Sequence, residues 1–544
     1  MNTTLLALNA SYSHTSLAAR YLRAACYEAG HPVALVEMTV NERSENISRA
    51  VFSERPDVLC CSVYIWNVRL MSDVCTRLKL MMPELYIVWG GPEVVGAEDV
   101  LQTNYPFVDV FCTGEGEAML PLLLQDLARG VRGPTCLAAG APLVMQALPD
   151  PYSEEADFDQ NRLYYFETSR GCPYNCAYCI SSREKGVRYL PEEVTWHRLE
   201  WLAQRVPLVK LVDRTFNSDR YRARRLWQRL IELPGDCRFH FEICAHLLCD
   251  EDFALLSQKA ARRLQFEVGL QSTSAQALSA VNRTVDAQLV LENVRRLVEL
   301  GTVEVHLDLI AGLPGEGHSD FLSSLERAMQ TRPHRLHLGF LKVLPGTQMR
   351  AIADTYDMSY LPYAPYEVLS TRDMGTEELL QLKDLESAIE SYYNSRRFEH
   401  AMRVLLDVLP AASLFSRLSD SLHTEADRKV FDIGLDSGLP EGLLRELVVL
   451  DFLLREPHRK PPAWIKPEYD EDAMLRELVY GQPDTLYKTL PHRAGVRPGI
   501  ILRDLRLCEV SGECLRHLGL STEKGLLLID HSQPRSRRIF PVPD

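Results

Sequence analysis

The sequence predicts an α/β protein with three parts: an open parallel sheet, then a partial βα barrel of six strand–helix units, then a mainly helical carboxyl-terminal region. Three observations support this. Short, β-rich apolar runs alternate with helix-period segments up to about residue 130, the alternation resumes over residues 161–357, and helical patterns dominate from residue 358 onward. We therefore expect domains at 1–135, 161–357 and 358–544, with a linker at 136–160.

The first domain is predicted to hold five parallel strands with helices between them, as in a doubly wound sheet. The strands are expected at Leu5–Leu8, Val33–Val36, Val58–Val63, Leu85–Trp89 and Val108–Cys112. Helical periodicity is found at Ser16–Ala29, Asn67–Met82 and Glu117–Ala128. In such a sheet, ligands bind beyond the carboxyl ends of the strands.

Two glycine-rich loops follow the fourth and fifth of these strands. Gly90-Gly91-Pro92 and Gly114-Glu115-Gly116 allow the backbone to approach a ligand closely, and they are equally compatible with plain tight turns. The segment 131–160, which includes the linker, contains Gly133-Pro134, Gly140-Ala141-Pro142 and Pro149-Asp150-Pro151, which are expected to interrupt any regular element.

The second domain is predicted to contain six strand–helix units, which favours a partial barrel over a second flat sheet. The strands are expected at Leu163–Thr168, Leu208–Asp213, Arg238–Ile243, Leu264–Val268, Val303–Ile310 and Leu336–Val343. Helices are expected at Pro191–Arg205, Asp219–Glu232, Asp250–Ala261, Ala287–Leu300 and Ser319–Thr331. In βα barrels the chemistry lies at the carboxyl ends of the strands.

The charge balance argues against a nucleic-acid partner. The chain of 544 residues has 60 Lys plus Arg against 74 Asp plus Glu, a net charge of −14. Phosphate contacts need a basic footprint, although this balance leaves room for a local basic groove. The densest basic stretch, six arginines between residues 214 and 229, has helical spacing and favours a solvated helix face over an RNA groove.

The sequence predicts a cytoplasmic protein without a membrane anchor. No apolar run approaches the roughly 20 residues that span a bilayer. The start, MNTTLLALNASYSH, lacks the basic region of a secretory signal. Most of the fourteen cysteines are scattered in apolar segments, which is typical of buried free thiols in a reducing compartment.

Three cysteines stand apart, because they follow the first barrel strand closely with the spacing C-x3-C-x2-C. Cys172, Cys176 and Cys179 could converge on a metal or cluster, and a four-iron cluster held by three cysteines keeps one iron open. Zinc would favour a further ligand pair, and the nearby His197 lies in a helical pattern. The remaining interpretation is a disulfide between two of these cysteines, with the third as a free thiol.

The segment GCPYNCAYC closely resembles the radical S-adenosylmethionine (SAM) enzymes. The resemblance implies a [4Fe-4S] cluster on Cys172, Cys176 and Cys179, whose open iron chelates SAM. It also implies reductive cleavage of SAM to a 5′-deoxyadenosyl radical, with a reductant such as flavodoxin or ferredoxin as partner.

Segments at the later strand ends look like the coproporphyrinogen-oxidase and methylthiotransferase branches of this superfamily. By that resemblance, Arg283 would meet the SAM carboxylate, Gln271 and Asp308 would meet the ribose, and Glu242 would line the same pocket. Tyr178 and Ile310 would flank the adenine. A zwitterion and a diol in a dry pocket need charged and polar partners of this kind.

The second barrel strand departs from a common superfamily pattern, in which a Gly-Gly-Glu segment supports the SAM amino group. Here the corresponding stretch is VDRTFNSD, with Asp213, Thr215 and Asn217. Similar substitutions occur in cobalamin-dependent branches, so the stretch indicates a subtype, and the partner of the amino group stays open.

The first domain resembles the Rossmann-type cobalamin-binding domain that precedes many such barrels, through its GGPEV and CTGEGE segments. The resemblance implies corrin contacts at Gly90, Gly91, Gly114, Glu115 and Gly116. The Asp-x-His-x-x-Gly motif of domains with a lower-axial histidine is missing. His14 is the only histidine of the first loop, so we expect either a corrin without a histidine ligand or a domain that has lost its cofactor.

The segment LSTRDMGTEELLQLKDLESAIESYYNSRRF resembles an uncharacterised carboxyl-terminal domain of bacterial cobalamin-type radical SAM proteins. Helices are expected at Thr376–Asn394, Arg397–Val408, Ala411–His423 and Leu439–Leu454, and strands at Gly499–Leu502 and Leu526–Ile529. No residue set in 358–544 has recognisable chemistry.

Together the resemblances imply cobalamin-dependent methyl transfer to an unactivated carbon. Two alternatives stay open: a cobalamin-free radical SAM enzyme of the methylthiotransferase or rearrangement type, and a non-catalytic iron–sulfur or cobalamin-binding sensor. A sensor has no need for Arg283, Gln271 and Asp308 together. The sequence indicates neither the substrate nor a catalytic residue.

Overall fold

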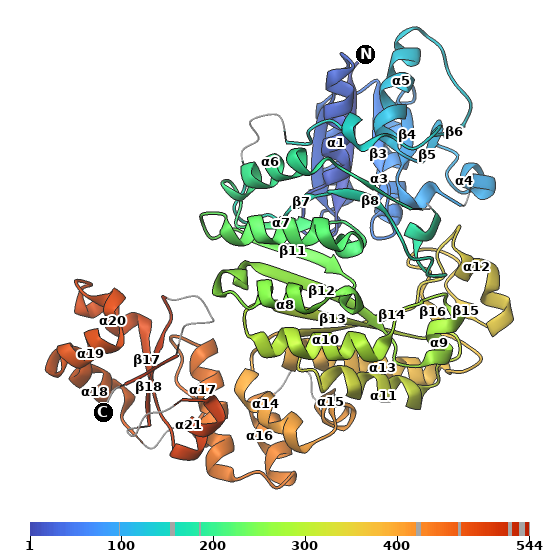
Figure 1. Ribbon diagram of the computed structural model, residues 1–544. Helices are drawn as coiled ribbons and strands as arrows, with labels where there is room; N and C mark the ends of the chain where they lie inside the picture. Colours follow the sequence, from blue (N-terminus) through green and yellow to red (C-terminus); the bar gives the residue numbers. More distant parts are fainter. Residues whose placement is uncertain are drawn as a thin grey trace. The chain divides into compact units, whose positions relative to one another are not determined.

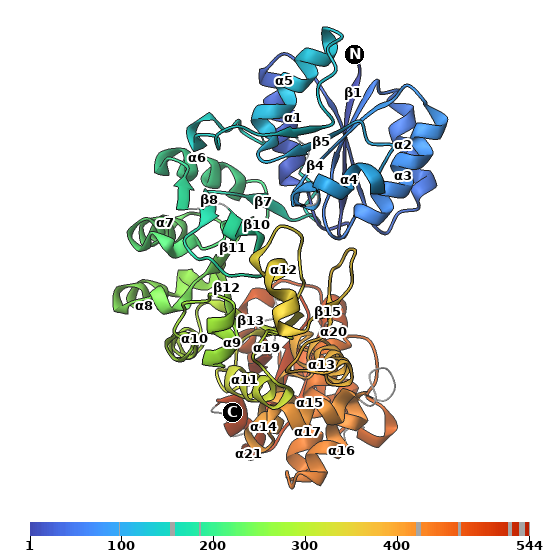
Figure 2. The ribbon, with the colours of Figure 1, turned by 90° about the vertical axis from the view of Figure 1, so that its right-hand side faces the viewer.

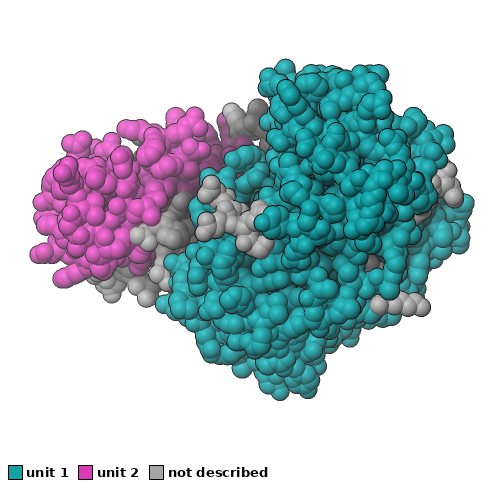
Figure 3. Space-filling view, turned by 90° about the horizontal axis from the view of Figure 1, so that it is seen from above, with its two compact units in different colours: residues 1–334, 338–379 teal, residues 335–337, 380–544 magenta. Residues whose placement is uncertain are grey.

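The computed structural model divides into two compact units, residues 1–334 with 338–379, and residues 335–337 with 380–544 (Figure 3). No helix in the described part of the chain is long and apolar enough to cross a membrane. The residues described are 1–96, 98–152, 158–183, 186–419, 426–465, 469–520, 525–532 and 539–542.

The amino-terminal sheet has the strand order β2-β1-β3-β4-β5-β6, and all its pairings are parallel. Its strands are β1 (Thr3–Asn9), β2 (Ala34–Thr39), β3 (Val58–Ser62), β4 (Tyr86–Gly90), β5 (Val110–Thr113) and β6 (Cys136–Ala138). The first five agree with the predicted strands to within a few residues.

Helices cover both faces of this sheet. Successive residues of a strand point to opposite faces, and here both sets of side chains are apolar. Leu6 and Leu8 pack with Trp89 in one buried cluster, whereas Leu5 packs with Val88 in another. Figure 2 shows α1 and α5 on one face and α2 and α3 on the other. The helices are α1 (Leu17–Glu28), α2 (Ser44–Ser53), α3 (Val68–Met81), α4 (Glu98–Asn104) and α5 (Gly116–Ala128).

Strand β6 lies in the segment that the sequence predicted to hold no regular element, so that prediction is wrong here. Phe111 of β5 pairs with Cys136 of β6 in parallel. Three residues at a sheet edge carry too little periodicity to be recognised in a sequence rich in Gly and Pro. Residues 153–157 of the predicted linker lie outside the described residues, and the predicted domain boundaries stay a prediction.

The second sheet has the order β14-β13-β12-β11-β10-β7, as expected for a partial barrel built from successive units. Its strands are β7 (Tyr164–Phe166), β10 (Leu208–Leu211), β11 (Arg238–Ile243), β12 (Leu264–Gln271), β13 (Glu304–Ala311) and β14 (Arg335–Phe340). A hairpin that the sequence did not predict, β8 (Ser169–Cys172) with β9 (Gly186–Tyr189), follows β7.

The helices of the partial barrel alternate with these strands, and Figure 1 shows α7, α8 and α10 along one side of the sheet. They are α6 (Glu192–Ala203), α7 (Arg220–Glu232), α8 (Asp250–Leu256), α9 (Ala275–Ala280), α10 (Ala287–Leu300) and α11 (His318–Met329). Helix α12 (Gln348–Ile352) and the short pair β15 (Ser359–Tyr360) and β16 (Val368–Ser370) follow β14.

The second unit is mainly helical and carries one antiparallel sheet, β17-β18-β19. Its longer helices are α14 (Glu399–Val408), α15 (Ala411–Ser419), α16 (Ala426–Asp436) and α17 (Glu441–Arg455), after α13 (Thr376–Ala388) and a π-helix (Ile389–Asn394). The shorter helices are α18 (Glu471–Arg476), α19 (Pro483–Thr489), α20 (Pro498–Asp504) and α21 (Gly512–Leu518). The strands are β17 (Leu505–Glu509), β18 (Leu526–Asp530) and β19 (Ile539–Pro541).

The strand predicted at Gly499–Leu502 is wrong, since these residues belong to helix α20. Pro498 occupies the first helical position, where its fixed φ favours a helix start. Ile501 is buried while Ile500 is exposed, as on one face of a helix. A four-residue apolar run cannot be assigned by periodicity alone. The prediction at Leu526–Ile529 is confirmed by β18.

Candidate active site

The cysteine loop connects the two strands of the hairpin, β8 and β9. Cys172 ends β8 and pairs with Gly186 at the start of β9. Gly171 has φ +94°, and a Cβ at this position would lie 2.2 Å from the carbonyl oxygen of Gly186. Only glycine therefore fits directly before the first cysteine.

The structure places Cys172 at the end of β8 and Cys176 and Cys179 on the loop that follows it, and their role as cluster ligands stays a prediction. Cys176 is buried, and Cys172 and Cys179 are half-buried. The loop is held by backbone hydrogen bonds from Ala177 N to Val281 O (2.8 Å) and from Cys179 N to Cys176 O (3.0 Å). All fourteen cysteines of the chain, each within the described ranges, are free thiols.

Arg283 and Gln271 lie beside this loop with buried polar atoms that nothing in the described chain satisfies. Arg283 Nη1 is 3.6 Å from Cys176 Sγ, and Nη2 donates to the carbonyl oxygen of Gly269. Arg283 Nε and Gln271 Oε1 are buried without a hydrogen-bond partner among the described residues. Buried polar atoms of this kind call for a ligand or water.

The close approach of these two side chains depends on a glycine and an irregular strand end. A Cβ on Gly269 would lie 2.3 Å from Gln271 Nε2 and 3.3 Å from Arg283 Nη2. The register of β12 against β13 shifts between Gly269 and Gln271, and Gln271 has φ +73°. The irregularity turns the Gln271 side chain toward Arg283.

Tyr178 belongs to the same group. Burial raises the pKa of its hydroxyl, while the charge of Arg283 acts in the opposite direction. The neighbouring Cys176 and Cys179 also raise the pKa of this hydroxyl. The structure therefore brings Tyr178, Gln271 and Arg283 together at the cysteines.

Glu242 and Asp308 form a second, neighbouring group on the inner face of the barrel. Burial raises the pKa of Glu242 to about 7, and the charges of Asp308 and Glu267 add to this effect, against Arg214 and Lys210. Ile310 follows Asp308 by two residues on β13 and is half-buried.

The VDRTFNSD stretch divides into structural and site-facing residues. Asp213 is buried and accepts hydrogen bonds from Thr168 Oγ1 (2.6 Å) and Ser169 Oγ (2.5 Å). Asn217 Nδ2 donates to the carbonyl oxygen of Cys244 (3.0 Å). Thr215 Oγ1 lies 3.5 Å from Cys172 Sγ. Thr215 is thus the residue of this stretch that contacts a motif cysteine.

A cavity of about 770 Å³ connects the loops of the amino-terminal sheet with the cysteine region. On the barrel side its wall includes Gly171 and Ile180, which flank the cysteine loop. On the sheet side it includes all five residues expected to contact a corrin, namely Gly90, Gly91, Gly114, Glu115 and Gly116. Two of these glycines are also required by their turns, because a Cβ would lie 2.5 Å from Val63 O at Gly91 and 2.6 Å from Ala139 Cβ at Gly114.

Sequence reasoning missed Arg170, which lines the same cavity. Its guanidinium pairs with Glu115 (3.0 Å), Glu117 (2.5 Å) and Glu167 (2.6 Å), and all four side chains are largely buried. Arg188 also pairs with Glu115 (2.7 Å). The position of Arg170, two residues before the first cysteine, was the available signal.

His14 also lines the cavity, and its Nδ1 is hydrogen-bonded to the Tyr165 hydroxyl. Burial, with a contribution from Lys210, lowers the pKa of His14, so the imidazole is neutral at neutral pH. The first loop is tied to β7 by hydrogen bonds from Leu163 N to Ser13 O (2.6 Å) and from Thr15 Oγ1 to Leu163 O (2.7 Å).

Three family models match successive parts of the chain. They are the B12 binding domain at residues 3–124, the Radical SAM superfamily at 166–328 and the Protein of unknown function (DUF4080) at 354–504. The chain therefore carries a B12-binding domain, then a radical SAM domain, then a DUF4080 domain. The resemblance inferred from the sequence is confirmed, including the uncharacterised carboxyl-terminal domain.

The chain matches curated relatives over part of their length. It is 29% identical over 348 residues to the 2-(S-pantetheinyl)-carbapenam-3-carboxylate methyltransferase of Streptantibioticus cattleyicolor, covering 57% of this chain and 49% of the relative. It is 32% identical over 179 residues to the hopanoid C-3 methylase of Methylococcus capsulatus, covering 30% and 35%. The chain spans about half the length of these relatives or less.

Two solved structures share the fold. The cobalamin-dependent SAM radical enzyme OxsB has a TM-score of 0.60 at 13% identity, covering 84% of this chain and 79% of that one. TsrM from Kitasatospora setae has a TM-score of 0.53 at 18% identity, covering 65% and 75%. The fold class predicted from the sequence is confirmed.

Proposed function

We propose that this chain is a cobalamin-dependent radical SAM enzyme that transfers a methyl group to an unactivated carbon. One observation carries the proposal: a single cavity of about 770 Å³ is lined both by the loops of the B12-binding domain and by Gly171 and Ile180 beside the cysteines. A corrin on the first wall and SAM on the second would share one space. The methylation activities that the relatives are named for agree with this reading.

The residues present fit a [4Fe-4S] cluster and SAM. Three free cysteines on one loop supply three ligands and keep one iron available. Arg283 Nε and Gln271 Oε1, buried without partners among the described residues, match a ligand that has both acceptor and donor groups. SAM is such a ligand, with its carboxylate and ribose hydroxyls.

The cavity also lies where a corrin would be expected to bind. It lies at the carboxyl ends of parallel strands, where open α/β sheets bind ligands. Asn9, Gly90 and Gly114 line it from three different strand ends.

When bound, the cluster supplies the electron that cleaves SAM to a 5′-deoxyadenosyl radical, and cobalamin supplies the methyl group. The chain's own residues position these groups. Arg283 would bind the SAM carboxylate, Gln271 and Asp308 the ribose, and Tyr178 and Ile310 would flank the adenine, with Glu242 in the same pocket. The ion pairs of Arg170 with Glu115 and Glu117 join the sheet side of the cavity to its barrel side.

The proposal is tested with anaerobically reconstituted full-length protein, SAM and a strong reductant. We expect formation of 5′-deoxyadenosine, and transfer of an isotope label from the SAM methyl group to protein-bound corrin. Label transfer without a substrate separates a methyltransferase from a cobalamin-free radical enzyme. Formation of neither product would favour a sensor and contradict the proposal.

The proposed enzyme needs an electron donor, and a flavodoxin or ferredoxin would meet this need. A reducing cytoplasm agrees with the fourteen free thiols, of which Cys26, Cys60 and Cys112 are buried against the amino-terminal sheet. Reduction of the cluster by a purified flavodoxin, followed by its visible spectrum, tests the partner.

A further inference from the structure

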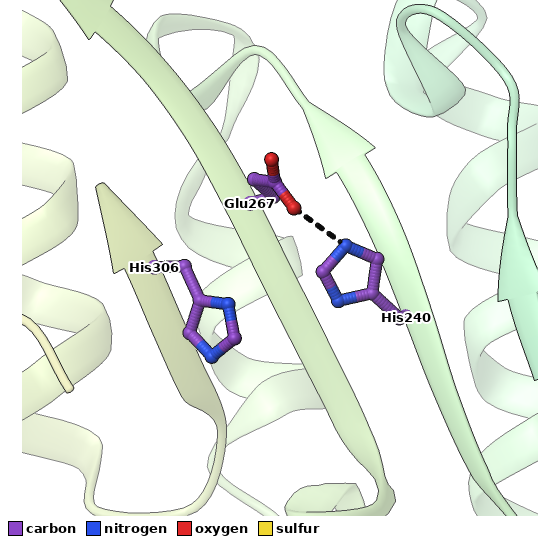
Figure 4. A group of neighbouring side chains, drawn as sticks. All are labelled: His240, Glu267 and His306. Atoms are coloured by element: carbon purple, nitrogen blue, oxygen red, sulfur yellow. Dashed lines mark hydrogen bonds and ion pairs between the residues drawn. The ribbon is translucent and has the colours of Figure 1, made fainter. Parts of the chain in front are cut away.

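Three neighbouring barrel strands place two imidazoles and a carboxylate on the inner face of the sheet. His240 comes from β11, Glu267 from β12 and His306 from β13, and Figure 4 shows the three side chains gathered around β12. Glu267 lies directly opposite His306 in the strand register. The alternation of polar and apolar residues in RFHFE and EVHLDL was a sequence signal for this face.

The ligand atoms of the three side chains are close enough to share one ion. One donor atom from each of His240, Glu267 and His306 lies within 4.8 Å of the other two. His240 Nε2 is 2.8 Å from Glu267 Oε2. The His240 side chain is 4% exposed, and that of His306 is 11% exposed. Two imidazoles and one carboxylate are a donor set of zinc and related transition metals.

A second carboxylate holds one of the imidazoles in place. Glu304 Oε1 is 3.0 Å from His306 Nε2. The other oxygen of Glu304 accepts hydrogen bonds from Arg238 Nη2 (2.5 Å) and Gln265 Nε2 (3.0 Å). A carboxylate bonded to an imidazole nitrogen orients the ring, which is how second-sphere carboxylates act in metal sites.

The surrounding charge favours a cation. Glu242 and Asp308 lie one layer further along the same strands, each two residues after a histidine. Glu242 lies opposite Glu267 in the strand register, and Asp308 lies opposite Gly269, two residues after Glu267. Lys210 and Arg214 face them with positive charge. A divalent ion at Glu267 would offset the negative charge of these three carboxylates.

We propose that His240, Glu267 and His306 bind a divalent transition-metal ion of the zinc class, with Glu304 as the orienting carboxylate of His306. The site lies one strand layer below Glu242 and Asp308 and uses none of the three motif cysteines. Its ion links β11, β12 and β13 through side chains. The role is structural, and the proposal does not depend on SAM cleavage or corrin binding.

The metal content of the purified full-length protein tests this proposal. After incubation with Zn²⁺ and removal of free metal, mass spectrometry should find about one zinc per chain in the protein with its cluster assembled. His240→Gln and His306→Gln should each lose most of this zinc. Glu304→Gln should retain the ligands and weaken the zinc affinity by roughly tenfold.

Two controls locate the metal. His197→Ala changes an exposed histidine of α6 and should keep the zinc. Cys172→Ala, Cys176→Ala and Cys179→Ala combined should also keep it, whereas loss of zinc in that variant would place the metal at the cysteines and overturn the proposal. Absence of zinc from the wild-type protein would overturn it as well.

Thermal unfolding covers the case in which a histidine variant does not fold. Zn²⁺ should raise the Tm of the wild-type protein by several degrees, because an ion that binds only the folded state stabilises it. Glu267→Gln should remove most of this rise. A rise of the same size in the Glu267→Gln variant would contradict the proposed ligand set.

Discussion

The guanidinium of Arg170 lies 3.0 Å from the carboxylate of Glu115, although the two residues are 55 positions apart in the chain. Arg170 precedes the first motif cysteine by two residues, and Glu115 belongs to a loop of the B12-binding sheet. Their side chains are 15% and 12% exposed. The pair therefore joins the two walls of the cavity in a poorly hydrated place, where an ion pair is screened little.

Replacing Glu115 by Gln should destabilise the protein at neutral pH by about 1–3 kcal/mol, since it removes one of the three carboxylates that pair with Arg170 and a carboxylate that pairs with Arg188. Hydrogen bonds from Arg188 and Leu143 N hold the pKa of Glu115 below its usual range despite burial. The stabilisation is present above the unfolded-state pKa and is lost as pH falls through the lower folded-state value. Urea unfolding at pH 7 and near pH 4 measures this difference.

The control is Glu45→Gln, which removes an equally short pair with Arg77 on the surface (3.0 Å, 61% and 42% exposed). Its effect should stay within about 0.5 kcal/mol at both pH values. Equal losses in the two variants would show that burial of the Arg170 group has no energetic consequence.

Replacing Cys172, Cys176 and Cys179 together by Ala should remove the broad visible absorbance and about four irons per chain after anaerobic reconstitution. Each thiol is a predicted iron ligand, and the chain offers no other such group on one loop in its described part. Cys136→Ala, at an exposed cysteine, should keep both signals. Iron retained in the triple variant would refute the assignment.

Arg283→Ala should weaken SAM binding by roughly tenfold to a hundredfold, because it removes a charge-assisted hydrogen bond worth about 1.5–3 kcal/mol. No other single substitution at the predicted SAM residues should have a larger effect. Equilibrium dialysis with the cluster assembled measures the affinity. Arg295→Ala, at an exposed position of α10, is the matched control and should bind SAM normally.

Glu242→Gln should stabilise the SAM-free protein at pH 8 and have little effect at pH 5. Burial raises the pKa of Glu242 to about 7, so the folded state holds a proton that the unfolded state, with a pKa near 4.5, releases. Stability is therefore present at low pH and lost as pH rises through this window. The gain at pH 8 should be about 1–3 kcal/mol by urea unfolding. A gain independent of pH would contradict the raised pKa.

Hydroxocobalamin should comigrate with the reconstituted protein on gel filtration, and His14→Ala should leave the corrin spectrum unchanged. The sequence lacks the motif that supplies an axial histidine, and His14 Nδ1 is bonded to Tyr165. A spectral change in His14→Ala would show that its imidazole ligates cobalt. Failure of any corrin to comigrate would favour a cobalamin-free enzyme.

Much of the fold was predictable because strand and helix periods are local properties of the sequence. Helix α10 begins and ends at the predicted residues, Ala287 and Leu300, since an Asp286 cap precedes an amphipathic run and Gly301 ends it. The hairpin of β8 and β9 was not predictable in this way. Its short strands pair through Gly171, and that pairing depends on a contact of backbone with backbone.

The sequence by itself determined the order of the domains, the cysteine motif and the loops at the strand ends, because each is written in neighbouring residues. Only the tertiary structure decided which distant polar side chains meet. Arg170 reaches Glu115, Gln271 turns toward Arg283 over Gly269, and His240, Glu267 and His306 gather across three strands. These contacts depend on strand order, register and local bulges. A change of register or a bulge alters which side chains lie next to one another across the sheet, and the sequence pattern of each strand stays the same.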